Sequence, residues 1–261
     1  MWKRRNKKKN FNKLNFLYIW FFLIWIFLYF TLSPDFSLIW EKTKENIIKK
    51  NVKENIKKEK EESKKEKSIY EKFDLESDNS IQKFVNNKIS FQNKKYSPKN
   101  LKNIRHIFIY STKNNSAILR EEAWEALKKL SIKFWENFEW NKIKIISWYR
   151  PYEEQKRIEK SWACHKTLCA KAGFSEHQTG LAIDIFETDE KLLEDEKIKK
   201  YMTWIKENAH KFGFHNSYQK WIKIDWYQKE AWHFRYLWIE LATYLKENNM
   251  SFAEFYEVTH P

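Results

Sequence analysis

Two short segments of the chain each combine a histidine with a carboxylate at the edge of an apolar stretch. SEHQTGLAID places His177 near a turn and Asp184 inside a strand-like run, and EAWHFR places Glu230 and His233 at the start of another. A carboxylate within an apolar strand is costly unless it is paired or binds a metal. Either segment alone is explained as well by a buried structural pair. Together they offer two imidazoles and one carboxylate, the ligand set of an open zinc site, and a second carboxylate that could take a proton from water.

The residues around these segments indicate a domain of mixed α and β structure. Apolar or alternating runs predict strands at residues 142–147, 181–186 and 232–239. Helical spacing, with end signals such as Ser116, Pro151 and Gly213, predicts helices at residues 116–135, 152–160, 197–212 and 240–249. Because strands and helices do not alternate regularly, we expect an α+β fold with a mainly antiparallel sheet and flanking helices.

Three motifs in a fixed order resemble the zinc D-alanyl-D-alanine carboxypeptidases of the VanY type. They are S-x-YR at residues 147–150, the segment SEHQTGLAID, and E-x-WH about 45 residues later. The resemblance covers roughly residues 100–245 and implies the Hedgehog/DD-peptidase-like fold. It also implies hydrolysis of the terminal peptide bond of peptidoglycan stem peptides, with release of D-alanine.

The resemblance assigns a role to each matching residue. It implies one Zn²⁺ per chain, with His177, Asp184 and His233 as its ligands. It implies Glu230 as the general base that deprotonates the zinc-bound water. Arg150 would hold the substrate carbonyl or the developing oxyanion through its fork of donors. Two further positions match residues that line the substrate site, Ser175 and Gln155.

Other functions remain open beside the D,D-carboxypeptidase. The motifs do not determine the shape of the substrate pocket, so an L,D-carboxypeptidase or another peptidoglycan peptidase of the same fold is a close alternative. A wall-binding module without catalysis is a more distant one. A degraded site of that kind should lack a ligand or Glu230, and all four residues are present.

The N-terminal region predicts a membrane anchor. Residues 1–13 carry seven basic residues and no acid, and residues 14–32 form 19 uncharged, mostly apolar residues. A helix of that length rises about 28 Å, close to the hydrocarbon core of a bilayer. The positive-inside rule then predicts a cytoplasmic N-terminus and an extracytoplasmic remainder. A cleaved signal peptide is the alternative, but the apolar run is long and no small-residue cleavage site follows it.

Charge separates the remaining regions. Residues 41–67 are a run of Lys, Glu and Asn with few apolar residues, typical of a solvated and partly helical stalk. We therefore predict a cytoplasmic tail at 1–13, an anchor at 14–32, a charged stalk or linker at 33–95 and a catalytic domain at 96–261. The chain has a net charge of +15, but residues 68–261 carry only +5. A nucleic-acid partner is therefore not expected.

Glycine and tryptophan occur in unusual proportion, with 3 Gly and 14 Trp in 261 residues. The VanY-like enzymes have Gly at the positions of Trp148 and Trp238, and Trp221 and Trp226 stand in turn-like surroundings. We hypothesise that the gene belongs to a lineage that reads UGA as Gly, so that several of these tryptophans are Gly in the cell.

Two cysteines, Cys164 and Cys169, lie five residues apart just before the second motif. Outside the cytoplasm a disulfide between them is expected. Two free thiols are the alternative, and Cys164 with His165 as additional zinc ligands is a third possibility.

Overall fold

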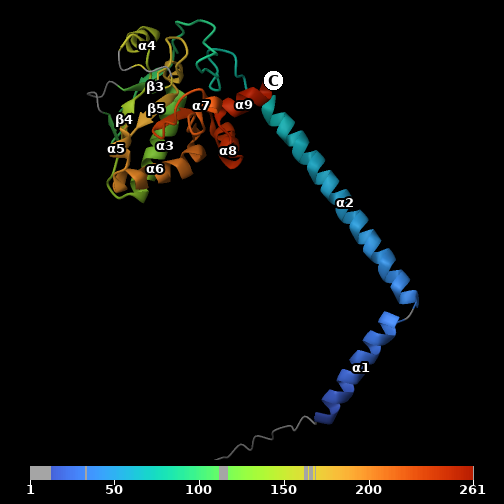
Figure 1. Ribbon diagram of the computed structural model, residues 1–261. Helices are drawn as coiled ribbons and strands as arrows, with labels where there is room; N and C mark the ends of the chain where they lie inside the picture. Colours follow the sequence, from blue (N-terminus) through green and yellow to red (C-terminus); the bar gives the residue numbers. More distant parts are fainter. Residues whose placement is uncertain are drawn as a thin grey trace, which may run out of the picture. The chain divides into compact units, whose positions relative to one another are not determined.

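The computed structural model describes residues 13–32, 34–111, 117–161, 164, 167 and 169–260 (Figure 1). The chain divides into two compact units, Met1–Lys67 and Ser68–Pro261. Each unit is described by itself below.

The first unit contains α1 (Lys13–Leu32) and most of α2 (Pro34–Tyr70). Proline at the first helical position and a sequence rich in Glu and Lys favour α2. Ion pairs one turn apart, Lys49–Glu45 at 2.5 Å and Lys57–Glu61 at 3.8 Å, add a little to it. The region predicted as a partly helical stalk is therefore one continuous helix from Pro34 through the end of the charged run.

The predicted membrane anchor over residues 14–32 coincides with α1. Among the residues that the structure describes, no helix is long and apolar enough to span a membrane. The anchor stays a prediction from the sequence.

The second unit is built around a five-stranded sheet of order β2-β4-β5-β7-β6. Only β2 and β4 pair in parallel, and the other neighbours are antiparallel. A small second sheet pairs β1 with β3. The strands are β1 (Leu101–Asn103), β2 (Ile109–Ser111), β3 (Ile118–Arg120), β4 (Ile143–Ser147), β5 (Ala182–Ile185), β6 (Phe214–His215) and β7 (His233–Tyr236). The predicted α+β class with a mainly antiparallel sheet is confirmed for this unit.

Helices surround the sheet, and their bounds refine the prediction. They are α3 (Glu121–Asn137), α4 (Tyr152–Glu159), the 3₁₀ turn η1 (Glu176–Thr179), α5 (Glu190–Leu193), α6 (Glu196–Asn208), the 3₁₀ turn η2 (Ala209–Phe212), α7 (Ile222–Asp225), α8 (Ile239–Glu247) and α9 (Phe252–Thr259). The predicted helix 197–212 is α6 continued by η2, and Gly213 ends it at φ +85°.

Two predicted bounds are wrong, one because of strand pairing and one because of a turn in the backbone. The helix expected at 116–135 begins only at Glu121, because residues 118–120 pair with residues 101–103 as strand β3. Ser116, its expected cap, lies outside the described residues. The strand expected at 232–239 ends at Tyr236, because Trp238 turns the chain at φ +74° and α8 begins at Ile239.

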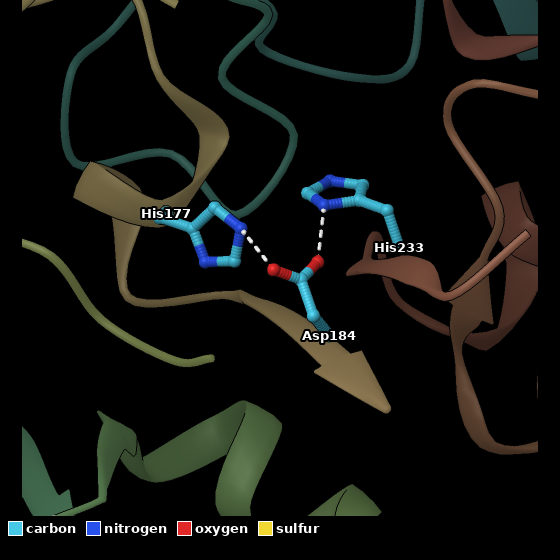
Figure 2. Close-up of side chains that lie close together, drawn as sticks. All are labelled: His177, Asp184 and His233. Atoms are coloured by element: carbon cyan, nitrogen blue, oxygen red, sulfur yellow. Dashed lines mark hydrogen bonds and ion pairs between the residues drawn. The ribbon is translucent and has the colours of Figure 1, made fainter. Parts of the chain in front are cut away.

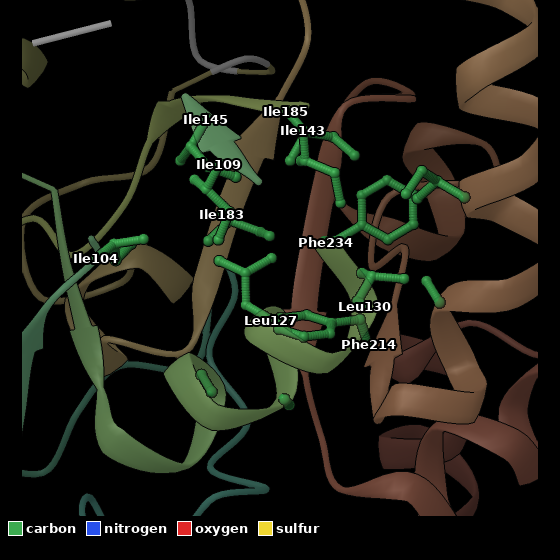
Figure 3. Close-up of a cluster of buried hydrophobic side chains, with 14 of the residues drawn as sticks. Ile104, Ile109, Leu127, Leu130, Ile143, Ile145, Ile183, Ile185, Phe214 and Phe234 are labelled. Carbon is green, nitrogen blue, oxygen red and sulfur yellow. The ribbon is translucent and has the colours of Figure 1, made fainter. Parts of the chain in front are cut away.

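The main core lies between α3 and the sheet (Figure 3). Leu127 and Leu130 of α3 pack into a cluster with isoleucines of β4 and β5, among them Ile143 and Ile183. All four side chains are almost fully buried. Burying this apolar surface stabilises β4 and β5, two neighbouring inner strands of the sheet.

Residues 68–95, which we assigned to the linker, belong to the compact second unit. Leu75 and Phe84 are buried in a second cluster with residues of α8 and α9, including Leu241 and Phe252. The boundary of the folded domain therefore lies at about Ser68 rather than residue 96. This boundary could not be predicted from the sequence, because the apolar residues of this segment are scattered without a helical or strand period.

Three tryptophans adopt a backbone conformation that favours glycine. Trp140, Trp226 and Trp238 have φ of +70°, +66° and +74°, and they make up half of the six described non-glycine residues with positive φ. Trp226 and Trp238 were among the predicted glycine positions, and Trp140 was not. Trp221 has φ −82°, an ordinary conformation, so its backbone gives no such support.

Candidate metal centre

Three side chains from three elements converge at one end of the sheet (Figure 2). His177 comes from η1, Asp184 from β5, and His233 from the first position of β7. Asp184 and His233 are direct cross-strand partners, which explains how residues 49 apart in the sequence meet. One possible ligand atom from each lies within 4.8 Å of the others.

The two histidines present different nitrogens to Asp184. The Nδ1 of His177 lies 2.8 Å from the carbonyl oxygen of Trp148, which can only accept, so Nδ1 carries the proton and donates it. The Nε2 of His177 then lies 3.2 Å from one carboxylate oxygen of Asp184. His233 instead turns its Nδ1 to the other oxygen of Asp184, at 3.0 Å.

Two further side chains hold the ring of His233. Its Nε2 lies 2.8 Å from Oε2 of Glu176, which also accepts a hydrogen bond from Ser217 at 2.8 Å. The ring of Tyr218 stacks on His233 with 4.6 Å between centroids. His233 and Glu176 are each only 2% exposed. The orientation of His233 is therefore determined by hydrogen-bond partners at both ring nitrogens and by the stacked ring of Tyr218.

The charges of the cluster compensate one another. Burial alone would raise the pKa of Asp184, but the neighbouring histidines hold it well below its usual range. Burial lowers the pKa of His177, which favours the neutral imidazole that metals bind. For His233, hydrogen bonds to Asp184 and Glu176 outweigh burial and raise the pKa to about 10. A positively charged His233 is thus favoured between the carboxylates of Asp184 and Glu176.

Glu176 is charged although it is buried. Burial would raise its pKa, but the hydrogen bond from His233 and the positive charge of Arg235 lower it below the ordinary value. Arg235 is fully buried two residues along β7 from His233, on the same face of the strand.

Glu230 lies at the mouth of the same cluster. Its carboxylate is 4.0 Å from Nδ1 of His233. The backbone of the segment is fixed, since the amide of Glu230 donates to the carbonyl of Tyr218 and its own carbonyl accepts from Asn216. Burial raises the pKa of Glu230 to about 7, although the charge of His233 opposes this. A carboxylate of that pKa can exchange a proton near neutral pH.

The three remaining predicted site residues line the same cavity as the cluster. Arg150 donates from Nη1 to Gln155 at 2.7 Å and from Nη2 to Ser147 at 2.9 Å. Gln155 is 1% exposed and donates in turn to the carbonyl of Ala170 at 2.6 Å. Ser175 is buried immediately before η1. Gln155 therefore supports Arg150 rather than projecting from a helix surface.

The cavity has a volume of about 490 Å³. Aromatic side chains of Tyr218, Tyr227 and Trp232 form part of its lining, and Cys164 and Cys169 form another part. The two cysteines are joined in a disulfide, as predicted, and are therefore not zinc ligands. His165 lies outside the described residues.

Sequence reasoning missed the contact between Glu176 and His233. Glu176 stands inside the quoted motif, but a glutamate in a polar, turn-like segment indicates exposure rather than burial. Residues 175–181 are in fact all buried, whether polar or apolar. The one available signal was that Glu176 directly precedes His177. That signal would have predicted a contact with His177, whereas Glu176 contacts His233.

The donor set fits a zinc ion. Zinc takes imidazole and carboxylate ligands at about 2.0–2.2 Å in a tetrahedral arrangement, which places neighbouring ligand atoms about 3.3 Å apart. The two spacings to Asp184, 3.2 Å from His177 and 3.0 Å from His233, are close to that value. Three protein ligands leave the fourth position of a tetrahedral zinc ion open for water, and the carboxylate of Glu230 lies beside this set.

Comparison with known proteins places these residues in a family. The family model described as VanY, D-alanyl-D-alanine carboxypeptidase, matches residues 116–239, which include all of the motifs. The putative carboxypeptidase YodJ of Bacillus subtilis (strain 168) is 33% identical over 164 residues. That match covers 58% of this chain and 58% of YodJ, so the chain spans less than two thirds of the relative's length.

Solved structures show the same fold. The structure of the LdcB LD-carboxypeptidase aligns with a TM-score of 0.59 at 30% identity, covering 69% of this chain and 87% of that one. The vancomycin-resistance D,D-pentapeptidase VanY, solved in complex with Zn(II), aligns with a TM-score of 0.51 at 23% identity, covering 66% and 97%. The VanY family model, together with the 30% identity to LdcB over 87% of that chain, shows that this chain belongs to the VanY family.

Proposed function

We propose that this protein is a membrane-anchored, extracytoplasmic zinc carboxypeptidase that removes the terminal D-alanine from peptidoglycan stem peptides. One observation carries the proposal. His177, Asp184 and His233 converge at the base of a cavity that also holds Glu230 and Arg150. Family membership adds the reaction class, and the geometry adds the residues that would perform it.

The three converging residues would hold one zinc ion. A bound zinc would act as a Lewis acid that polarises the scissile carbonyl and lowers the pKa of water toward neutrality. The protein's part is to keep His177 neutral, to keep Asp184 ionised, and to hold both imidazoles in fixed orientations. For His177 the carbonyl of Trp148 performs the last task.

Glu230 would act as general base and then as general acid. It takes a proton from the attacking water on its carboxylate and delivers that proton to the amine of the departing D-alanine. Its burial supports this role, because a pKa raised toward neutrality suits a group that must both accept and release a proton.

Arg150 would bind the oxygen of the scissile carbonyl as negative charge develops on it. Its guanidinium is held by Gln155 and Ser147 at 2.7 and 2.9 Å, so the remaining donors are presented to the cavity in one orientation. A positively charged donor fixed before the reaction stabilises developing charge without reorganising.

An L,D-carboxypeptidase is the second candidate. It is favoured by one observation, the match to the LdcB structure at 30% identity over 87% of that chain. The two activities differ in the residue that precedes the terminal D-alanine. That residue would lie along the cavity wall formed by Trp232, Tyr227 and the disulfide rather than at the metal.

The location rests on the N-terminal sequence. Residues 14–32 are uncharged and follow seven basic residues, which supports an anchor with the catalytic unit outside the cytoplasm. The disulfide agrees with an oxidising compartment. Fractionation tests this point: the full chain should stay with membranes through a high-salt wash and be released only by detergent. Release by salt alone would overturn the anchor.

The activity is tested with the full chain in detergent micelles. Two synthetic stem peptides are offered, a pentapeptide ending in D-Ala-D-Ala and a tetrapeptide with one terminal D-alanine. We expect D-alanine release from the pentapeptide, loss of release with a chelator, and recovery with added Zn²⁺. Release from the tetrapeptide alone would establish the L,D activity instead. Release that persists with chelator would overturn the zinc mechanism.

A further inference from the structure

The side of His233 that faces away from Asp184 is occupied by a buried carboxylate. Glu176 Oε2 lies 2.8 Å from His233 Nε2, whereas Asp184 faces Nδ1 on the opposite side of the ring. Glu176 is outside the group of three residues whose ligand atoms converge. It therefore contacts a candidate ligand without being one itself.

The same oxygen of Glu176 is held from a second direction. Ser217, itself 3% exposed, donates its hydroxyl to Oε2 at 2.8 Å. The backbone of Glu176 lies in η1, directly before His177. One short segment thus provides a candidate ligand, His177, and the residue that orients the other histidine, His233.

The partners of the two histidines differ in kind. His177 donates to a neutral backbone carbonyl, and His233 donates to a charged carboxylate. A carboxylate that accepts the outer N–H of a ligand histidine fixes its tautomer and increases the electron density on the coordinating nitrogen. For His233, an Nε2–H held by Glu176 leaves the lone pair on Nδ1, the nitrogen that faces Asp184.

We propose that Glu176 is a positioning residue that holds His233 in the tautomer and orientation that binds metal through Nδ1. The proposal rests on the proposed function, because it assumes that the cluster binds zinc. It extends that function to a residue that touches neither substrate nor metal. Ser217 supports Glu176 in this role.

The test measures zinc affinity by competition with a chromophoric chelator, using the full chain in detergent. Glu176→Met fills a similar volume but accepts no hydrogen bond, whereas Glu176→Gln keeps an oxygen that accepts from Nε2. We expect Glu176→Met to weaken zinc binding by about 10–100-fold and Glu176→Gln to recover most of that loss. Unchanged affinity in Glu176→Met, or equal losses in both variants, would overturn the proposal.

A control separates this effect from the loss of any carboxylate that pairs with a buried cationic side chain. Glu122 pairs with buried Arg120 at 2.8 Å and lies outside the residues that line the cavity. Glu122→Gln should lower thermal stability and leave zinc affinity unchanged. A comparable loss of zinc affinity in this control would show that the Glu176 effect is general destabilisation.

A measurement on the unaltered chain does not depend on how the variants fold. Long-range ¹H–¹⁵N spectra of the zinc-loaded protein report which nitrogen of each histidine carries a proton. We expect a proton on Nε2 of His233 and on Nδ1 of His177, and the opposite tautomer at His233 would overturn the proposal. A chain that binds no zinc would instead overturn the proposed function, which the chelator titration shows directly.

Discussion

The base and the rim of the cavity are held together in different ways. The base consists of His177, Asp184 and His233, which are almost fully buried and compensate one another's charges. The rim consists of Arg150 and the Cys164–Cys169 disulfide, which are partly exposed. Arg150 is held by hydrogen bonds to Gln155 of α4 and Ser147 of β4. Removing one partner from a buried cluster of charges leaves an unpaired buried charge, which is costly in free energy. A change at the partly exposed rim does not carry that cost. The base should therefore determine whether zinc is bound, and the rim should determine how the peptide and its transition state are held.

The largest expected effect comes from Glu230, which lies beside the base. Glu230→Gln keeps the shape and removes the proton acceptor, so turnover should fall by about 10²–10⁴-fold while zinc affinity should stay unchanged, because Glu230 is not one of the three ligands. Release of D-alanine and chelator competition measure the two quantities. Glu187→Gln, at the end of β5 in an ion pair with Lys144, is the control and should keep its turnover. Near-normal turnover in Glu230→Gln would remove Glu230 from the mechanism.

Removing Arg150 tests whether the rim contributes to the reaction as well as to binding. Arg150→Ala should lower kcat/KM by about 10²–10³-fold, the usual loss for a donor to a developing oxyanion, with zinc affinity unchanged. Arg157→Ala, an exposed arginine of α4, is the control and should behave like the unaltered protein. A large loss of zinc affinity in Arg150→Ala would contradict the separation of base and rim.

Opening the disulfide should affect the rim alone. Gln155 donates to the carbonyl of Ala170, and Gln228 donates to both the carbonyl and the hydroxyl of Thr167. The disulfide loop thus supports two walls of the cavity. The double change Cys164→Ser with Cys169→Ser should weaken peptide binding by about 1 kcal/mol, about a fivefold rise in KM. Turnover at saturation should be unchanged, and reducing agent on the unaltered protein should reproduce the effect. A fall in kcat at constant KM would contradict it.

The smallest effect concerns a position outside both regions. Trp238 follows β7 at φ +74° and ψ 154°, a conformation that glycine adopts almost alone. Trp238→Gly should raise the free energy of unfolding by about 1 kcal/mol without changing zinc affinity or KM. Thermal and denaturant unfolding measure it. Trp221→Gly also removes an exposed tryptophan but at φ −82°, so it should be neutral or destabilising.

If the free energy of unfolding rises in Trp238→Gly and does not rise in Trp221→Gly, the gain comes from the backbone conformation rather than from loss of the indole. Equal signs would contradict that reading. The codons test the related hypothesis: UGA at 140, 226 and 238 would support glycine at these positions in the cell, and UGG at 148 and 238 would end it.

The fold class could be predicted because it depends on local patterns, and the ligand set could be predicted because the three motifs resemble those of the VanY-like enzymes. The apolar runs of β5 and β7 are strand-forming by themselves, and pairing them places Asp184 opposite His233. The S-x-YR motif meets the same place because the amide of Arg150 donates to the carbonyl of His177. The start of α3 and the role of residues 68–95 could not be predicted, since they depend on pairing and packing with distant segments.

The sequence by itself determined the residue types of the site, the order of its three motifs and the charge contrast between the N-terminal region and the domain. Only the tertiary structure decided which nitrogen of each histidine faces Asp184, and that Glu176 contacts His233 rather than its neighbour His177. The physical reason is that side-chain orientation follows from the hydrogen-bond partners available after folding. Those partners, Trp148 for one ring and Glu176 for the other, lie 29 and 57 residues away along the chain.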